Sequence, residues 1–472
     1  MALPNPRDLP TIVLVVFDTA RRDRFGCYGY DRPTTPTVDS LARGGTRFDA
    51  MVANAPWTLP SHASLFTGLY PTQHGSQWRT GPKLRPSVGP TMAQWLAGLG
   101  YDTWCVTNNG MIGERTTLSR GFDTYAFRLD IERGRVRRLR RARKVAFGGD
   151  SGGAIVNRWM RERLPRARRP LFLFVNYMEC HWSYAPPPSY VRKVGGPRYR
   201  FPRAMRYRAE MAARVGPWEA VARSDAHDLD VLSTYYDGEL AHADHHLEEL
   251  LDTLSRTGHL RDDGRGLLLV ASDHGEHLGE HGLADHHASL DELMTTVPFV
   301  SWGPGIVPGG AVREPLAEFV DVMPSLAALL DVDPPAEYLE RRRTDLFGAG
   351  RDGHAYAFAE WRAWTDHERE RLASRNPAYR EFDALGRDLV AVRDDRMKLV
   401  RGSDGTADLY DLLEDPHEER NLAGARPDDA ARLGSQLDAR LTEWASWESE
   451  TSTITAEERE EIERRLEDLG YI

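Results

Sequence analysis

The amino-acid sequence predicts an α/β protein with a mixed, mostly parallel central sheet between layers of helices. Three uninterrupted apolar runs carry this prediction: TIVLVVF at 11–17, PLFLFVN at 170–176 and GLLLVA at 266–271. Each run has the length of a strand, and none alternates apolar with polar residues, which is typical of parallel strands covered on both faces. Segments with helical spacing separate the runs, so helices should cover the sheet.

The first part of the chain alternates predicted helices and strands. After the strand at 11–17, short helices are expected at 35–45 and 91–99, followed by a strand at 102–107. Another helix should begin near Pro60, because proline is tolerated in a first helical turn, and it should stop at Gly68. This places Thr58 just ahead of that helix.

The second part predicts a change of architecture. Beyond the strands at 170–176 and 266–271, we expect a long helix at 229–254, a strand at 297–302 and a helix at 320–330. Asp333-Pro334-Pro335 then breaks the chain, and we place a catalytic α/β domain at 1–345 and a small C-terminal α+β subdomain at 346–472. The subdomain should hold a hairpin at 389–400, a strand at 408–412 and two helices, the last at 455–469.

Composition excludes several classes of protein. The 472 residues are 41% hydrophobic and 28% charged, as in soluble globular proteins, and the net charge of -10 gives no sign of a specific nucleic-acid partner. No apolar run approaches the roughly 20 residues of a membrane helix. Three scattered cysteines give no disulfide framework, and no signal peptide is recognisable, so we expect a cytoplasmic location.

Two arginine-rich stretches interrupt the predicted catalytic domain, at about 128–170 and 198–225. They could form a basic lid that attracts an anionic substrate. We favour the simpler interpretation that they are solvated helical faces or subunit contacts. Exchange of the C-terminal helices could also make a homo-oligomer.

Residues suited to chemistry follow the predicted strands. Asp18 directly follows the first strand, and Asp273-His274 follow the strand at 266–271. In open α/β sheets, sites form beyond the carboxyl ends of the strands, so these side chains could share a metal ion. Thr58 would lie at a helix N-terminus, which favours an anion, and its hydroxyl could act as a nucleophile. The alternative is an N-cap threonine without chemistry.

At these residues the chain resembles the sulfatase family of the alkaline phosphatase superfamily, and the resemblance extends over nearly the whole chain. The family carries Cys-x-Pro-Ser-Arg, whose cysteine matures to formylglycine. The matching segment here is Thr58-Leu59-Pro60-Ser61-His62. Threonine cannot be converted to formylglycine, but relatives elsewhere in the superfamily use a plain Thr or Ser on phosphate esters. The resemblance implies an alkaline phosphatase-like fold.

The resemblance also implies roles for individual residues. One divalent metal ion would be held by four residues: Asp18, Asp273, His274 and Thr58. Because one ligand is an imidazole, Mn, Zn or Fe suits the site better than Ca. Thr58, His181 and His286 would be catalytic, with Glu179 orienting His181. Asn108, His62 and His287 would contact the substrate, although Asn109 could donate to an ester oxygen instead of Asn108.

The long predicted helix contains a second possible ligand pair. His242 and His246 are four residues apart and share a helix face. Polar residues on a helix that packs on a sheet normally face water, so we discount a metal there. The usual second site of bimetallic relatives needs Asp-x-x-x-His, and Asp237 and His242 have the wrong spacing. We therefore predict a single metal.

The predicted function is metal-dependent hydrolysis of a small anionic sulfate, phosphate or phosphonate ester with Thr58 as nucleophile. We favour phosphorus esters, phosphodiesters among them, because a sulfated threonine would have to be attacked at sulfur. The alternatives are a sulfatase that works without formylglycine, a phospho-group transferase and a non-catalytic anion-binding protein.

Overall fold

The computed structural model describes residues 9–77, 81–131, 144, 148–195, 226–260, 265–335, 344–348, 353–364, 370 and 386–447. Within these residues the chain folds around a nine-stranded sheet and a separate four-stranded sheet. The predicted insertion at 198–225, much of the one at 128–170 and the predicted helix at 455–469 lie outside the described residues.

The larger sheet has the order β10-β2-β9-β6-β1-β5-β3-β4, and β11 pairs with β2. Its strands are β1 (Thr11–Phe17), β2 (Thr46–Val52), β3 (Asp102–Thr107), β4 (Thr124–Phe127), β5 (Leu171–Tyr177), β6 (Gly266–Ala271), β9 (Thr296–Trp302), β10 (Ala311–Arg313) and β11 (Ala317–Glu318). Only β9 runs antiparallel to its described neighbours, β2 and β6. The predicted mixed, mostly parallel sheet is confirmed.

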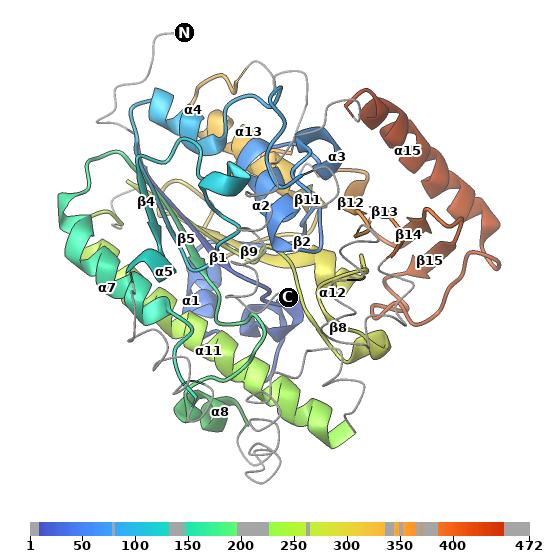
Figure 1. The fold of residues 1–472 in the computed structure, drawn as a ribbon, viewed down its shortest axis with the longest axis horizontal. Coiled ribbons are helices and arrows are strands. Elements are labelled where there is room, and N and C mark those ends of the chain that lie inside the picture. Colours follow the sequence, from blue (N-terminus) through green and yellow to red (C-terminus); the bar gives the residue numbers. More distant parts are fainter. Residues whose placement is uncertain are drawn as a thin grey trace.

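Helices cover both faces of this sheet (Figure 1). One side holds α1 (Pro36–Gly44), α7 (Gly153–Arg163), α8 (Pro188–Gly195) and the long α11 (Ala226–Arg256). The other side holds α2 (Thr58–Thr67), α4 (Met92–Gly98) and α13 (Val322–Leu329). This double cover explains why β1, β5 and β6 are buried along their whole length and read as continuous apolar runs.

Shorter elements fill the connections. Single-turn α-helices are α3 (Pro71–His74), α5 (Arg128–Ile131) and α12 (Glu292–Thr295), and β7 (His277–Leu278) pairs with β8 (Ala284–Asp285). Short 3-10 helices occur at Arg22–Arg24, Gly26–Tyr28, Glu114–Thr116, Leu164–Arg166, Glu280–Gly282 and Phe319–Asp321. Among the helices that the structure describes, none is both long and apolar enough to cross a membrane.

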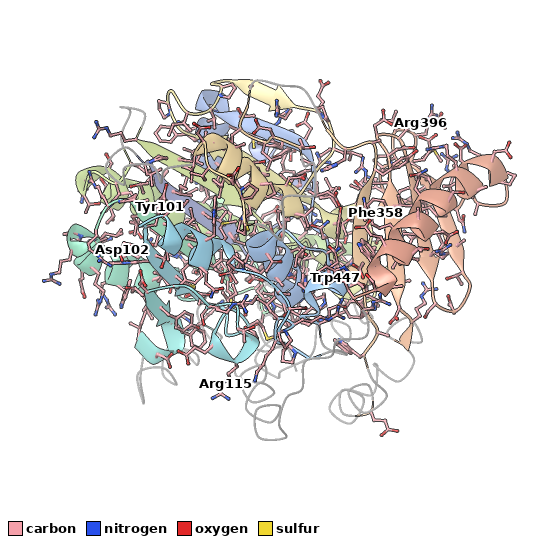
Figure 2. All side chains as sticks on the ribbon, turned by 90° about the horizontal axis from the view of Figure 1, so that it is seen from above. Tyr101, Asp102, Arg115, Phe358, Arg396 and Trp447 are labelled. Carbon is pink, nitrogen blue, oxygen red and sulfur yellow. The ribbon has the colours of Figure 1, made fainter. Side chains whose placement is uncertain are left out.

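The smaller sheet is antiparallel and lies near the C-terminal end. It consists of β12 (Ala357–Trp361), β13 (Leu389–Arg393), β14 (Met397–Gly402) and β15 (Ala407–Asp411). Helix α15 (Pro427–Ala445) packs on it through Leu433, Leu437 and Trp444. Figure 2 shows this sheet and α15 as a lobe beside the main sheet. The predicted hairpin and strand are confirmed, whereas the domain boundary at 345 stays a prediction.

One predicted detail is wrong, and several strands were not predicted, β2 and β12 among them. Thr58 is the first residue of α2 rather than the residue ahead of it, and Trp57 is the N-cap. Strand β2 has the sequence TRFDAMV, in which partly exposed polar residues interrupt the apolar ones. It pairs antiparallel with β9, and such strands lack the continuous apolar run that identifies a buried parallel strand.

A buried carboxylate joins the two sheets. Glu318, in β11, accepts hydrogen bonds from the Tyr70 hydroxyl at 2.8 Å, the Asn54 amide at 2.9 Å and the Phe358 backbone N–H at 3.0 Å. Phe358 belongs to β12, the first strand of the smaller sheet. One side chain therefore fixes the small lobe to the edge of the large sheet.

We predict that Glu318→Ala lowers the free energy of unfolding by roughly 2–4 kcal/mol, because three buried donors lose their acceptor. Urea unfolding followed by circular dichroism measures this change. Glu314→Ala, four residues earlier at an exposed position, is the control and should change stability by less than about 0.5 kcal/mol. Equal losses in the two variants would contradict the role of Glu318.

Candidate active site

The carboxyl ends of adjacent strands bring three potential metal ligands together. Asp18 follows β1, and Asp273 and His274 follow its neighbour β6. One ligand atom from each of the three lies within 4.8 Å of the others, and all three side chains are buried. Parallel strands end at the same sheet edge, so residues about 255 positions apart meet for a topological reason.

In each of the two carboxylates, hydrogen bonds fix one oxygen and leave the other oxygen free to bind a ligand. Oδ2 of Asp18 accepts from the amides of Asn109 at 2.8 Å and Asn176 at 3.1 Å. Oδ1 of Asp273 accepts from two backbone N–H groups, those of Thr19 and His274. Oδ1 of Asp18 and Oδ2 of Asp273 are buried with no hydrogen-bond partner among the described residues.

The tautomer of His274 follows from its contacts. Its Nδ1 lies 2.9 Å from the Gly275 carbonyl oxygen, an acceptor, so Nδ1 carries the proton. The lone pair on Nε2 is then available, and Nε2 lies 3.3 Å from Oδ2 of Asp273. This imidazole and two carboxylates with unused oxygens form a donor set for a divalent cation.

The electrostatics of the two carboxylates also fit a cation. Burial and the charge of Asp273 raise the pKa of Asp18 to about 7. Although burial acts in the opposite direction, His274 and His62 hold the pKa of Asp273 well below its usual range. Two carboxylates that crowd each other without water are costly, and a divalent cation between them removes that cost.

Thr58 lies beside this group, at the start of α2. Its Oγ1 is 3.4 Å from Nε2 of His274 and accepts a hydrogen bond from the Asn109 amide at 3.3 Å. The side chain is fully buried. At the first position of the helix, the hydroxyl is close to backbone N–H groups that favour a negatively charged ligand.

Three more histidines continue the cluster. The ring of His286 lies 4.6 Å from those of His274 and His287 and 5.2 Å from that of His181, measured between centroids. Nδ1 of His286 is 2.7 Å from Oδ1 of Asp285. The structure thus brings His181, His286 and His287 beside the metal ligands.

These histidines differ in charge. Burial lowers the pKa of His286, but the carboxylates of Asp285 and Glu276 outweigh it and raise the pKa well above its usual value. Burial and the neighbouring His286 lower the pKa of His181 to about 3. One imidazolium therefore stands among neutral imidazoles, and it can supply a proton at neutral pH.

The remaining predicted residues lie close by, with different contacts. The amide of Asn108 is buried with no hydrogen-bond partner among the described residues, whereas the next residue, Asn109, contacts both Asp18 and Thr58. Nδ1 of His62 lies 2.9 Å from the Thr58 carbonyl oxygen and 3.4 Å from Oδ2 of Asp273. Glu179 accepts from the Gly153 N–H, and Nδ1 of His181 lies beside the Trp182 carbonyl oxygen.

Sequence reasoning missed several supporting residues. It gave no role to Asn176, Glu276 or Asp285, although the first holds Asp18 and the other two hold His286. Two of them could have been recognised from their positions in the sequence. Asn176 is the penultimate residue of β5, and Asp285 immediately precedes His286.

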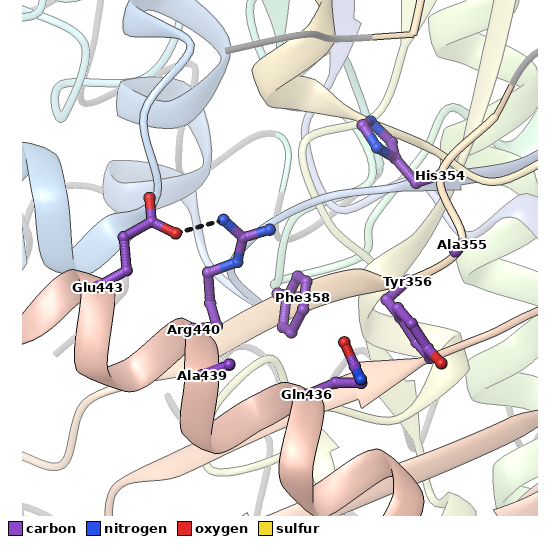
Figure 3. Close-up of a pocket in the computed structure, with 8 residues that line it drawn as sticks. All are labelled: His354, Ala355, Tyr356, Phe358, Gln436, Ala439, Arg440 and Glu443. Atoms are coloured by element: carbon purple, nitrogen blue, oxygen red, sulfur yellow. Dashed lines mark hydrogen bonds and ion pairs between the residues drawn. The ribbon is translucent and has the colours of Figure 1, made fainter. Parts of the chain in front are cut away.

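A hollow of about 340 Å³ elsewhere on the protein is unrelated to this cluster. Figure 3 shows it between β12 and α15, with Arg440 paired to Glu443 at one end. None of its lining residues belongs to the cluster described above, and the lining offers neither an orphaned carboxylate nor a nucleophile positioned by a helix N-terminus. The candidate active site is therefore the cluster at the strand ends.

The sulfatase family model matches residues 10–332, which span the large sheet and the histidine cluster. The chain belongs to the sulfatase family. It is 24% identical to an uncharacterized sulfatase of Escherichia coli over 450 residues, covering 88% of this chain and 83% of that protein. A choline-sulfatase of Rhizobium meliloti is 32% identical over 218 residues, 44% of this chain and 37% of the other.

A solved structure shows the same fold. The phosphonate monoester hydrolase of Agrobacterium radiobacter superposes with a TM-score of 0.70 at 21% identity, covering 93% of this chain and 96% of that one. The alkaline phosphatase-like fold and ester hydrolysis therefore hold for this sulfatase-family chain. Enzymes of the family depend on a metal ion, and the structure has candidate groups of ligands for one.

A buried arginine ties the loop that carries the histidines to the end of β1. The guanidinium of Arg21 pairs with Glu280 at 2.6 Å and donates to the Glu276 carbonyl oxygen at 3.3 Å. Only 3% of its side chain is exposed. Burial raises the pKa of Glu280, but Arg21 outweighs it and lowers the pKa from 4.5 to about 2.

We predict that Glu280→Gln removes roughly 1–3 kcal/mol of stability at neutral pH. A lowered carboxyl pKa stabilises the fold above the unfolded value. The difference from wild type should therefore be complete above about pH 5 and disappear as the pH falls from 4.5 towards 2. Denaturant unfolding at several pH values measures it, with the exposed Glu162→Gln as control. A difference that does not change with pH would indicate lost packing instead.

Proposed function

We propose that this sulfatase-family chain is a metal-dependent hydrolase of sulfate, phosphate or phosphonate esters that uses Thr58 as its nucleophile, with phosphorus esters favoured. The observation that carries the proposal is the position of Thr58 Oγ1, 3.4 Å from Nε2 of His274 and hydrogen-bonded to Asn109. A hydroxyl beside metal ligands and at a helix N-terminus is suited to attack an anionic ester.

The metal would be held by one imidazole, two carboxylates and the nucleophilic hydroxyl: His274, Asp18, Asp273 and Thr58. When bound, the ion lowers the pKa of the hydroxyl and neutralises charge on the transferred group. The imidazole ligand favours Mn, Zn or Fe over Ca. We propose one ion at this catalytic centre.

In the proposed reaction, the hydroxyl proton of Thr58 passes to bulk water, and Oγ1 forms a bond to phosphorus or sulfur. The bond from that atom to the ester oxygen breaks, and His286 gives its proton to the departing alcohol. His181, Asn108, His62 and His287 line the space for the anionic group, and Asn109 orients the hydroxyl. Water then attacks the same phosphorus or sulfur atom and gives a proton to His286, the bond to Oγ1 breaks, Oγ1 takes up a proton from bulk water, and the phosphate, phosphonate or sulfate product leaves.

The residue at position 58 supports the preference for phosphorus. Sulfatases of this family release sulfate from a formylglycine hydrate by elimination, and threonine offers no such route. The phosphonate monoester hydrolase likeness agrees with this preference, and the relatives named as sulfatases support the second candidate, a sulfatase that works without formylglycine.

We predict that Thr58→Ala lowers kcat by at least about 10³-fold on the preferred ester, because among the described residues no other hydroxyl contacts the ring of His274; that of Ser272 donates to the His274 backbone carbonyl instead. Turnover of matched aryl sulfate, phosphate monoester, phosphodiester and phosphonate monoester by metal-loaded protein measures this loss. Thr67→Ala, at the far end of the same helix, is the control.

The outcomes separate the candidates. Phosphorus-ester turnover that needs Thr58 supports the proposal, and Thr58-dependent preference for sulfate supports the second candidate. Transfer of the phospho group to an added alcohol would indicate a transferase. Turnover unchanged in Thr58→Ala would refute the nucleophile. No turnover on any of the four esters would leave two alternatives, a narrow natural substrate or a non-catalytic anion-binding protein.

A further prediction concerns the proton donor. His286→Asn should slow hydrolysis of an alkyl ester by roughly 10²–10⁴-fold, because its alcohol leaves only after protonation. A nitrophenyl ester, whose leaving group needs no proton, should lose less than about 10-fold. Rates of both esters on the same metal-loaded protein provide an internal control. Equal losses would assign His286 to binding rather than proton transfer.

The location of the protein also stays a proposal. We propose the cytoplasm, on the basis of the amino-acid sequence, and fractionation of cells expressing the full chain would test it.

A further inference from the structure

A second group of buried potential ligands lies on the helical side of the sheet. His242 and His246 of α11 are 5% and 2% exposed, so the expectation that they face water is wrong. Their side chains turn towards the segment that precedes α7, where Asp150 lies. One ligand atom from each of these three residues lies within 4.8 Å of the others, and the group shares no residue with the catalytic centre.

The distances within this group match those between donors to one ion. Nε2 of His246 lies 2.9 Å from Oδ2 of Asp150, and Nε2 of His242 lies 4.0 Å from the same oxygen. Oε1 of the fully buried Glu179 adds a fourth atom, 3.6 Å from Nε2 of His246. Donors around a tetrahedral zinc ion lie about 3.3 Å apart, given metal–ligand bonds near 2.0–2.1 Å.

The orientation of His246 provides an independent observation. At 2.9 Å from a carboxylate its Nε2 would normally make a hydrogen bond, but Nε2 has no hydrogen-bond partner among the described residues, while Nδ1 lies 3.6 Å from Oε2 of Glu249. The nitrogen is therefore close to the oxygen without pointing at it. Two ligands of one metal ion have this relation, because both direct lone pairs at a third point. Oε2 of Glu179 is likewise buried without a partner in that part of the chain.

Surrounding contacts hold the residues in place. Gly153 lies so close to His246 that a Cβ there would collide with the ring, and its N–H donates to Oε1 of Glu179 at 2.9 Å. The ring of Tyr190 lies 4.7 Å from that of His242.

We propose that this cluster is a second metal site, separate from the catalytic centre, that binds a divalent first-row transition ion such as zinc. Its ligands come from three segments: Asp150, Glu179, His242 and His246. Two histidines with two carboxylates suit such an ion better than Ca. Since Glu179 precedes His181 by two residues, the ion fastens the loop that carries His181 to α11.

The test measures zinc content after the full chain has been stripped with a chelator, reloaded with Zn²⁺ alone and passed through a desalting column. Wild type should hold two equivalents. His242→Gln/His246→Gln should hold one, and so should Asp273→Ala, which lacks a catalytic ligand. The matched control is His245→Gln, because His245 is on the same helix but its side chain is 45% exposed, and it should hold two.

Two results would overturn the proposal: equal zinc in wild type and the double variant, or no zinc in Asp273→Ala. The first would show that the cluster is an ion-paired network of a protonated His246. If the double variant does not fold, the Asp273→Ala protein decides the question without it. Loaded with Co²⁺, it should show the visible absorption of a histidine-ligated ion, and His242→Gln in that background should remove the band. An unchanged band would refute the site.

Discussion

Two carboxylates buried within reach of one another, Asp18 and Asp273, set the constraints on the rest of the structure. Both side chains are fully buried, so a negative charge on either one must be balanced by hydrogen bonds or by an opposite charge. Amides of Asn109 and Asn176 hold the first, and backbone N–H groups hold the second. Thr19, two residues after the end of β1, adopts a left-handed φ of 61°, and its backbone N–H donates to Asp273. A divalent cation bound between the two carboxylates would balance the negative charge that these hydrogen bonds leave.

The order of the strands delivers the other functional groups to the same place. In the sheet, β6, β1, β5 and β3 are consecutive neighbours and parallel. The segments after their carboxyl ends supply, in that order, Asp273, Asp18, His181 and Asn108. This is why the fold and much of the candidate site could be predicted together: a continuous apolar run marks a buried strand, and the polar residue after it marks the sheet edge.

Other features could not be predicted because they depend on residues remote in the sequence. A sequence pattern does not distinguish Asn108 from its neighbour Asn109. The turn of the chain after β3 is what brings Asn109 to Thr58. The helical spacing of His242 and His246 indicated one face of a helix but not what covers it. The residue that lies against this face is Asp150, more than 90 positions earlier in the sequence. We expected these side chains to face water, as polar residues on a helix that packs on a sheet normally do, and the packing of α7 against α11 overturns this expectation.

The identity of the proposed nucleophile, Thr58, also has a conformational consequence. Threonine is β-branched, so in a helix its side chain has fewer χ1 rotamers than serine would have. At the first position of α2 this stiffness, with the Asn109 hydrogen bond, holds Oγ1 beside Nε2 of His274 before any substrate arrives. A nucleophile positioned in advance needs little reorganisation in the transition state, and that gain is independent of which metal is bound. The helix thus contributes through geometry as well as through its dipole.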